Sequence, residues 1–317
     1  MKKPLRLTEN IYLIDGHDLG VEERTGAYVL KERDVTLIET SASPSIPYIL
    51  EGLKNLGIAP EEVKYVIVTH IHLDHSGGAG LLLEYCPNAK VVVHPKGARH
   101  LADPSKLIAS AKAVYREKFN SLFDPILPID EGRIIIKSAQ ETLEIGENCL
   151  LTFYDSPGHA NHHFSIYHPG VAGVFIGDTA GIYYPQLKRK GIEFYIPSTS
   201  PNQFDPDKML QSINIYKELK AERLFFGHFG MTENPSETFK QVEGWLPVFI
   251  TEAQSAFNET DDFESRTRLT SKRLFQRLKT NLLERGIKED DPILEILALD
   301  LEVSSMGLID YLTKKSS

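Results

Sequence analysis

Short apolar runs separated by turns and helical segments fill the first three quarters of the chain. Runs rich in β-branched residues predict strands at 10–14, 27–30, 35–38, 63–68, 89–94, two between 137 and 154, 164–167, 173–177 and 221–226. Helices are expected from Pro44 to Leu56, within 96–120 and from Asp205 to about Leu219. Interleaved strands and helices of these lengths predict an α/β fold.

The pattern changes at Pro235. Beyond it the sequence is charged and helix-prone, with no convincing strand and with breaks at Gly286 and at Pro292. We therefore predict a catalytic domain at 1–235 and a helical C-terminal appendage at 236–317.

Composition narrows the class of protein. Its 317 residues are 41% hydrophobic and 25% charged, as in ordinary globular proteins, and the net charge of −9 argues against a nucleic-acid partner. Cys86 and Cys149 are expected to be small buried hydrophobes rather than a disulfide. No signal peptide or run of about 20 apolar residues is present, so we predict a cytoplasmic protein with no membrane partner. A small-molecule substrate is expected, and a homodimer is left open.

Four side chains that can bind metal fall within six positions, where a strand passes into a helix. They are His70, His72, Asp74 and His75, preceded by the strand at 63–68. Imidazole and carboxylate groups suit zinc, iron or manganese. A tight turn cannot easily offer all four to one ion, so the motif favours two ions.

Three more candidate ligands follow later strands. His159 comes after a strand and a Pro-Gly turn, Asp178 ends the strand at 173–177, and His228 ends the strand at 221–226. Asp178 would by itself more simply cap a turn, but as a strand-end carboxylate it could bridge two cations. His163 is expected to support the site, and His162 to be structural.

The order strand, acidic turn, helix, strand, histidine occurs twice along the chain. It runs once through Glu39 to His70 and again through Asp178 to His228. This repetition predicts two related halves that meet at a shared site.

These motifs resemble those of the metallo-β-lactamase superfamily, in the branch that includes glyoxalase II and the lactonases, over residues 8–235. The resemblance implies a four-layer αββα sandwich of two mixed sheets. It departs at Glu39, where the family usually has Asp, and at the turn 158–163, which usually reads Gly-His-Thr-x-Gly-His. The glutathione-binding basic residues of glyoxalase II are not evident, which argues against that activity.

By the same resemblance, two divalent metal ions are expected, zinc above iron or manganese. His70, His72 and His159 would hold one ion, Asp74, His75 and His228 the other, and Asp178 would bridge them. A hydroxide between the two ions would then attack a small ester, thioester or lactone. Asp74 would act in catalysis, by steering the nucleophile or shuttling a proton.

Other functions are compatible with these residues. A persulfide dioxygenase-like oxidoreductase would use one iron, a phosphodiesterase or nuclease would cleave a phosphodiester, and a purely structural metal site would usually contain cysteine. Tyr183 and Tyr184 either donate to substrate or pack under a loop. The segments 96–125 and 182–204 are candidate lids. In the first, Tyr115, Phe119 and Phe123 form either an apolar pocket wall or part of the core or of a dimer interface.

Overall fold

The computed structural model describes residues 3–316, and its first sheet has seven strands. In spatial order they are β1 (Leu5–Arg6), β2 (Ile11–Asp15), β3 (Gly26–Leu30), β4 (Val35–Ile38), β5 (Val63–Ile67), β6 (Lys90–Val93) and β7 (Ile134–Ile136). The strands from β1 to β4 pair antiparallel, and those from β4 to β7 pair parallel, so the sheet is mixed.

The second sheet has six strands. Their order is β15 (Met231–Thr232), β14 (Arg223–Phe226), β11 (Gly173–Gly177), β10 (Phe164–His168), β9 (Cys149–Asp155) and β8 (Thr142–Gly146). All neighbours are antiparallel except β11 and β14, which are parallel.

The two sheets pack face to face because successive side chains of each strand point to opposite faces. Ile38 and Ile67 of the first sheet share one buried cluster with Phe153 and Phe175 of the second. Their neighbours in sequence, such as Leu37, join a different cluster on the opposite face. The first sheet is thus buried on both faces, as a largely parallel sheet requires.

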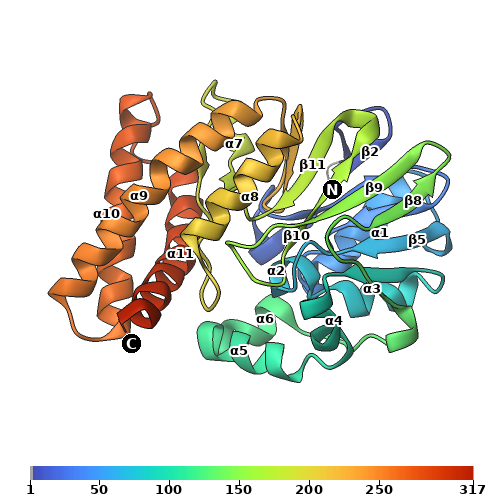
Figure 1. Ribbon diagram of the computed structural model, residues 1–317, viewed down its shortest axis with the longest axis horizontal. Coiled ribbons are helices and arrows are strands. Elements are labelled where there is room, and N and C mark those ends of the chain that lie inside the picture. The colour runs from blue at the N-terminus through green and yellow to red at the C-terminus, as the bar shows by residue number, and fades with distance from the viewer. Residues whose placement is uncertain (1–2, 317) are drawn as a thin grey trace. The chain divides into compact units, whose positions relative to one another are not determined.

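Helices cover the outer face of the first sheet (Figure 1). The helices of this region are α1 (Ile46–Asn55), α2 (Leu73–Ser76), α3 (Ala79–Tyr85), α4 (Pro95–Ala102), α5 (Ser105–Tyr115) and α6 (Phe119–Phe123). Ile49 of α1 and Leu82 of α3 pack against the outward-facing side chains of β4 to β6. On the far face of the second sheet, Ser165 Oγ lies 2.6 Å from the hydroxyl of Tyr216 in α8 (Pro206–Glu218). The expected sandwich of mixed sheets is confirmed.

The repeated order predicted from the sequence corresponds to two parallel strand pairs. β4 pairs with β5 across α1, and β11 pairs with β14 across the segment that contains α8. At the end of the first strand in each pair, Glu39 and Gly177 both have a positive φ, of 68° and 50°. Both halves therefore turn sharply at the edge where the candidate ligands begin.

By its contacts, the chain divides into two compact units. The first comprises 1–156, 162–177 and 216–235, and holds both large sheets. The second comprises 157–161, 178–215 and 236–317, and contains β12 (Ile182–Tyr183), β13 (Tyr195–Ile196), α7 (Pro185–Lys188), most of α8, α9 (Pro235–Glu259), α10 (Phe263–Glu284) and α11 (Ile293–Ser316). The C-terminal region is helical as expected, and the predicted division at residue 235 stays a prediction.

Several short strands escaped prediction. β7 lies just before the strands expected between 137 and 154, and β12 and β13 lie in the segment 182–204, which was expected only as a candidate lid. Two- and three-residue strands are too short to show an alternating pattern, so only their pairing partners reveal them. Among the helices of residues 3–316, none combines the length and apolarity needed to cross a membrane.

Candidate metal centre

The motif that begins at His70 lies at the end of β5 and runs into a helix. His70 and His72 occupy the connecting loop, and Asp74 and His75 lie within α2 rather than on a turn. The helix explains how adjacent residues reach different directions, because successive side chains on a helix are rotated by about 100°. His70 and His75 are at most 1% exposed, while the side chain of Asp74 is 26% exposed.

The first unit brings five of the predicted ligands together. The ring centroid of His70 lies 4.6 Å from that of His72 and 4.2 Å from that of His75. Asp74 Oδ2 lies 3.5 Å from His75 Nε2 and 3.6 Å from His228 Nε2. His228 is only 7% exposed and lies in sequence between the buried Phe226 and Phe229.

Glu39 lies inside this cluster and is only 2% exposed. Its Oε1 accepts hydrogen bonds from the backbone N–H and the hydroxyl of Thr69, and its Oε2 lies 3.7 Å from His75 Nδ1. The Thr69 hydroxyl also lies 3.0 Å from His70 Nδ1. These contacts orient both rings through Nδ1, as outer partners of metal-binding histidines do. Glu39 thus contacts the His75 ring directly and reaches the His70 ring through the Thr69 hydroxyl.

A second set of contacts fixes the backbone of the motif. Leu73, between two predicted ligands, is buried with Phe119 and Phe123 of α6. These two phenylalanines are 1% and 2% exposed, so they form packed core rather than a pocket wall. Burying each such side chain contributes about 2 kcal/mol, so Leu73 packs α2 against this core.

His163 supports the cluster from the start of β10. Its Nδ1 lies 2.8 Å from Ser156 Oγ, and its ring stacks on that of His70 at 5.0 Å. Gly177 makes this approach possible, because a Cβ there would lie 2.3 Å from His163 Nε2. The His162 Nδ1 lies 3.5 Å from the backbone N–H of Ile71, at the limit of hydrogen bonding.

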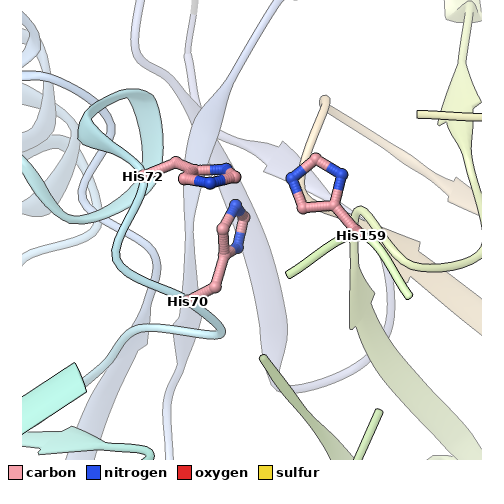
Figure 2. A group of neighbouring side chains, drawn as sticks. All are labelled: His70, His72 and His159. Carbon is pink, nitrogen blue, oxygen red and sulfur yellow. The ribbon is translucent and has the colours of Figure 1, made fainter. Parts of the chain in front are cut away.

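The second unit brings the other two predicted ligands together. His159 and Asp178 are each only 2% exposed, and His159 Nε2 lies 3.7 Å from Asp178 Oδ2. The backbone carbonyl of Ser198 accepts a hydrogen bond from His159 Nδ1 at 3.0 Å, and Ser198 Oγ donates to Asp178 Oδ2 at 3.2 Å. The first of these bonds places the proton on Nδ1, and Ser200 Oγ lies 3.3 Å from Nε2, the nitrogen that would bind a metal. Figure 2 labels His70 and His72, from the loop after β5, and His159, from the turn after β9.

The C-terminal helix α11 holds the segment that carries Ser198. Thr199 Oγ1 donates a 2.8 Å hydrogen bond to the carbonyl of Ser304. Gly307 lies against the same segment, where a Cβ would come within 2.0 Å of the Thr199 carbonyl oxygen. Ser198 and Ser200 lie in the segment 182–204, which the sequence indicated only as a candidate lid.

A buried ion pair lies near the first-unit cluster. Asp18 Oδ2 lies 3.2 Å from Arg24 Nε, and both side chains are less than 8% exposed. Burial raises the pKa of Asp18 to about 6, Arg24 opposes that rise, and the charge of Asp74 adds to it. Sequence reasoning missed this pair because nothing local distinguishes it from a solvated turn.

Tyr183 and Tyr184 are engaged within the second unit. Tyr183 stacks on Tyr195 of the paired strand at 5.4 Å, and the Tyr184 hydroxyl donates to Asp300 Oδ2 at 2.8 Å. Both rings are buried, which favours the packing role over substrate contact.

The donor set of the first unit fits divalent metal. Two overlapping groups, Glu39 with His70 and His75, and Asp74 with His75 and His228, each present three donor atoms within 4.8 Å of one another. Neutral imidazole and carboxylate donors without cysteine match zinc, iron or manganese of a reactive site better than a closed structural zinc site.

Comparison with known proteins agrees with this geometry. The model of the metallo-beta-lactamase superfamily matches residues 23–228, about two thirds of the chain. The chain belongs to the metallo-beta-lactamase superfamily. Most members of this superfamily are metal-dependent hydrolases. The match spans the motif at His70 and ends at His228, whereas assignment to the glyoxalase II and lactonase branch stays a prediction.

Individual superfamily relatives are distant. A metallo-beta-lactamase fold-containing protein, ST1585 of Sulfurisphaera tokodaii, is 29% identical over 54% of this chain and 62% of its own. An N-acyl homoserine lactonase of Bacillus thuringiensis is 27% identical over 57% of this chain and 61% of its own. The chain thus spans about three fifths of the length of these curated relatives.

Solved superfamily structures share the fold. The archaeal protein ST1585 superposes with a TM-score of 0.66 at 22% identity, covering 95% of this chain and 98% of its own. The family protein TTHA1429 of Thermus thermophilus also gives 0.66, at 18% identity, covering 98% and 95%. At such identities the likeness establishes the fold alone.

Proposed function

We propose that this protein is a metal-dependent hydrolase of a small ester, thioester or lactone. The observation that carries the proposal is the group of Asp74, His75 and His228 in the first unit, whose donor atoms lie within 4.8 Å of one another. Superfamily membership and the lactonases among the relatives support the same reaction class.

The ligands divide as the family resemblance implies. One ion would be held by His70, His72 and His159, the other by Asp74, His75 and His228, with Asp178 between them. Two bound ions would lower the pKa of a shared water toward about 7 and polarise a carbonyl oxygen. Glu39 and Thr69 would hold the His70 and His75 rings in orientation, because they occupy the Nδ1 sides.

Asp74 is the side chain placed to transfer a proton during the reaction. Its carboxylate lies between His75 and His228, and at 26% exposed it is more accessible than either ring. A carboxylate in that place can accept a proton from the attacking water and pass it to the leaving oxygen or to solvent. Replacing it with an amide would keep the shape and remove the base.

Charge favours an uncharged substrate carbonyl. Two divalent ions would bring four positive charges, which Asp74, Asp178 and one hydroxide reduce to one. The carboxylate of Glu39, which accepts two hydrogen bonds from Thr69, would offset that last charge. A nearly neutral site suits an ester, thioester or lactone better than a polyanionic phosphodiester.

The test combines metal analysis with a substrate panel. We expect about two zinc-type ions per purified chain and hydrolysis of at least one ester, thioester or lactone, lost on chelation and restored by zinc. Asp74→Asn should lower kcat by about 100-fold or more. The control Asp261→Asn changes an exposed carboxylate outside the cluster and should leave kcat unchanged.

Two outcomes would refute the proposal. Hydrolysis that persists after complete metal removal would exclude a metal-dependent mechanism. One iron per chain, with oxygen consumed in the presence of a persulfide, would establish the dioxygenase alternative instead.

A further inference from the structure

A second group of potential ligands lies in the first unit, away from the histidine motif. Glu32 precedes β4, Cys149 begins β9 and His168 ends β10, and one donor atom from each lies within 4.8 Å of the others. Cys149 Sγ is 3.3 Å from His168 Nε2. His163 of the histidine cluster precedes the other end of β10, so about five residues of extended strand, roughly 16 Å, separate the two places.

The cysteine and the histidine of this group are buried and in the neutral form. Cys149 is a free thiol, and the two side chains are 5% and 4% exposed. Burial raises the pKa of the Cys149 thiol to about 12, with the charge of Glu32 adding to the rise. Burial lowers the pKa of His168, so its imidazole is neutral at physiological pH.

These shifts argue against a nucleophilic Cys–His pair. A reactive cysteine needs a pKa lowered by a positive neighbour, whereas here burial and a carboxylate act in the opposite direction. A divalent cation would reverse that balance, because it stabilises the thiolate and the carboxylate together. Thiolate, imidazole and carboxylate are the three ligand types that zinc accepts.

The local backbone leaves room for the carboxylate beside the thiol. Gly146 pairs with Cys149 across the β8–β9 hairpin, and a Cβ at Gly146 would lie 2.8 Å from Glu32 Oε2. Asn10 Nδ2 donates a 3.2 Å hydrogen bond to Glu32 Oε1. The backbone N–H of Asp34 donates to the carbonyl of Ile145, which ties the Glu32 turn to the same hairpin.

We propose that Glu32, Cys149 and His168 form a separate site for one zinc-type divalent cation. Cys149 Sγ would bind the ion as its proton leaves to solvent, with no change in oxidation state. His168 would bind through Nε2 and Glu32 through Oε2, and the fourth position of a tetrahedral ion would hold water. The ion would cross-link the first sheet, through the β3–β4 turn, to β9 and β10 of the second.

Cobalt distinguishes this site from the histidine cluster. Thiolate bound to Co²⁺ gives a near-ultraviolet sulfur-to-metal charge-transfer band, and none of the seven ligands predicted for the hydrolytic site is a cysteine. Titrating the full-length protein with Co²⁺ should produce a band that saturates at one thiolate-bound ion per chain. Cys149→Ser should abolish the band, whereas Cys86→Ser, the same change at the other buried cysteine, should retain it.

The proposal fails if the wild-type protein shows no such band, if the band survives Cys149→Ser, or if Cys86→Ser removes it. Circular dichroism would establish whether each variant folds. Glu32→Gln keeps the thiol and changes only a partly exposed turn residue, so it provides a test that does not depend on the cysteine variants. It should raise the Kd for the cobalt that produces the band by at least about tenfold, and an unchanged Kd would also overturn the proposal.

Discussion

Gly307 offers a test of how the C-terminal helix supports the His159 segment. Glycine inside a helix is normally a weakness, so Gly→Ala at such a position should stabilise the fold by about 1 kcal/mol. Gly307 of α11 is buried, and a Cβ there would lie 2.0 Å from the Thr199 carbonyl oxygen, against 3.4–4 Å for an ordinary contact. We expect Gly307→Ala to destabilise the protein instead.

The matched control is Gly244, which also lies inside a long helix. A Cβ at Gly244 would meet nothing within 4 Å, so Gly244→Ala should gain the full helix propensity of about 1 kcal/mol. Forcing a methyl group into a packed contact costs about 1–3 kcal/mol. Because the propensity term is common to both variants, the difference between them should be about 1–3 kcal/mol.

Urea unfolding followed by circular dichroism would measure both free energies of unfolding. A second readout is zinc affinity, which should fall in Gly307→Ala because the 198–200 segment that contacts His159 must shift. Gly244→Ala should bind zinc as the wild type does. If Gly307→Ala were as stabilising as Gly244→Ala, the close packing of α11 on Thr199 would be refuted.

Two further substitutions test the environment of the cluster and of the second sheet. Glu39→Gln should lower zinc affinity about 10–100-fold, because the amide supports the His75 ring more weakly than the carboxylate does. Chelator competition would measure this affinity, and the control Glu61→Gln, at an exposed position, should leave it unchanged. Equal zinc affinities of Glu39→Gln and the wild type would refute a supporting role for Glu39. Burial raises the pKa of Tyr216 from 10 to about 12, so its neutral hydroxyl contributes stability that is complete below pH 10 and is lost as the pH rises through 12. Between pH 8 and 11 this loss is about 1.4 kcal/mol in the wild type, and it should be absent in Tyr216→Phe, which removes the contact with Ser165. Urea unfolding at both pH values would decide, and equal pH dependence in the two proteins would contradict the burial of the hydroxyl.

Longer helices and strands could be predicted from the sequence, whereas the shortest strands could not. β9, with seven residues, alternates between buried and more exposed positions, and β5 is marked by its run of β-branched residues. The two-residue strands β12 and β13 have no period to detect, since their pairing is decided by a partner about a dozen residues away. The repeat of strand, turn and strand was visible in sequence, but the parallel pairing of β11 with β14 required the sheet.

The same distinction applies to the site. His70, His72, Asp74 and His75 are close in sequence, so their spacing alone indicated metal chemistry. The supporting contacts are distant in sequence: Glu39 lies 30 residues from Thr69, and Ser198 lies 39 residues from His159. No local pattern could identify these partners, because a glutamate or serine there is chemically ordinary until the fold buries it.

The amino-acid sequence by itself determined the α/β character, the candidate ligands at the strand ends and the superfamily resemblance, because each depends on short-range spacing. Only the tertiary structure decided that Glu39 supports the histidine rings, that α11 packs on the 198–200 segment, and that Glu32, Cys149 and His168 lie together. Those contacts arise where sheet pairing and close packing bring distant residues within a few ångströms. Burial then changes their chemistry, by removing water from groups that would otherwise be solvated.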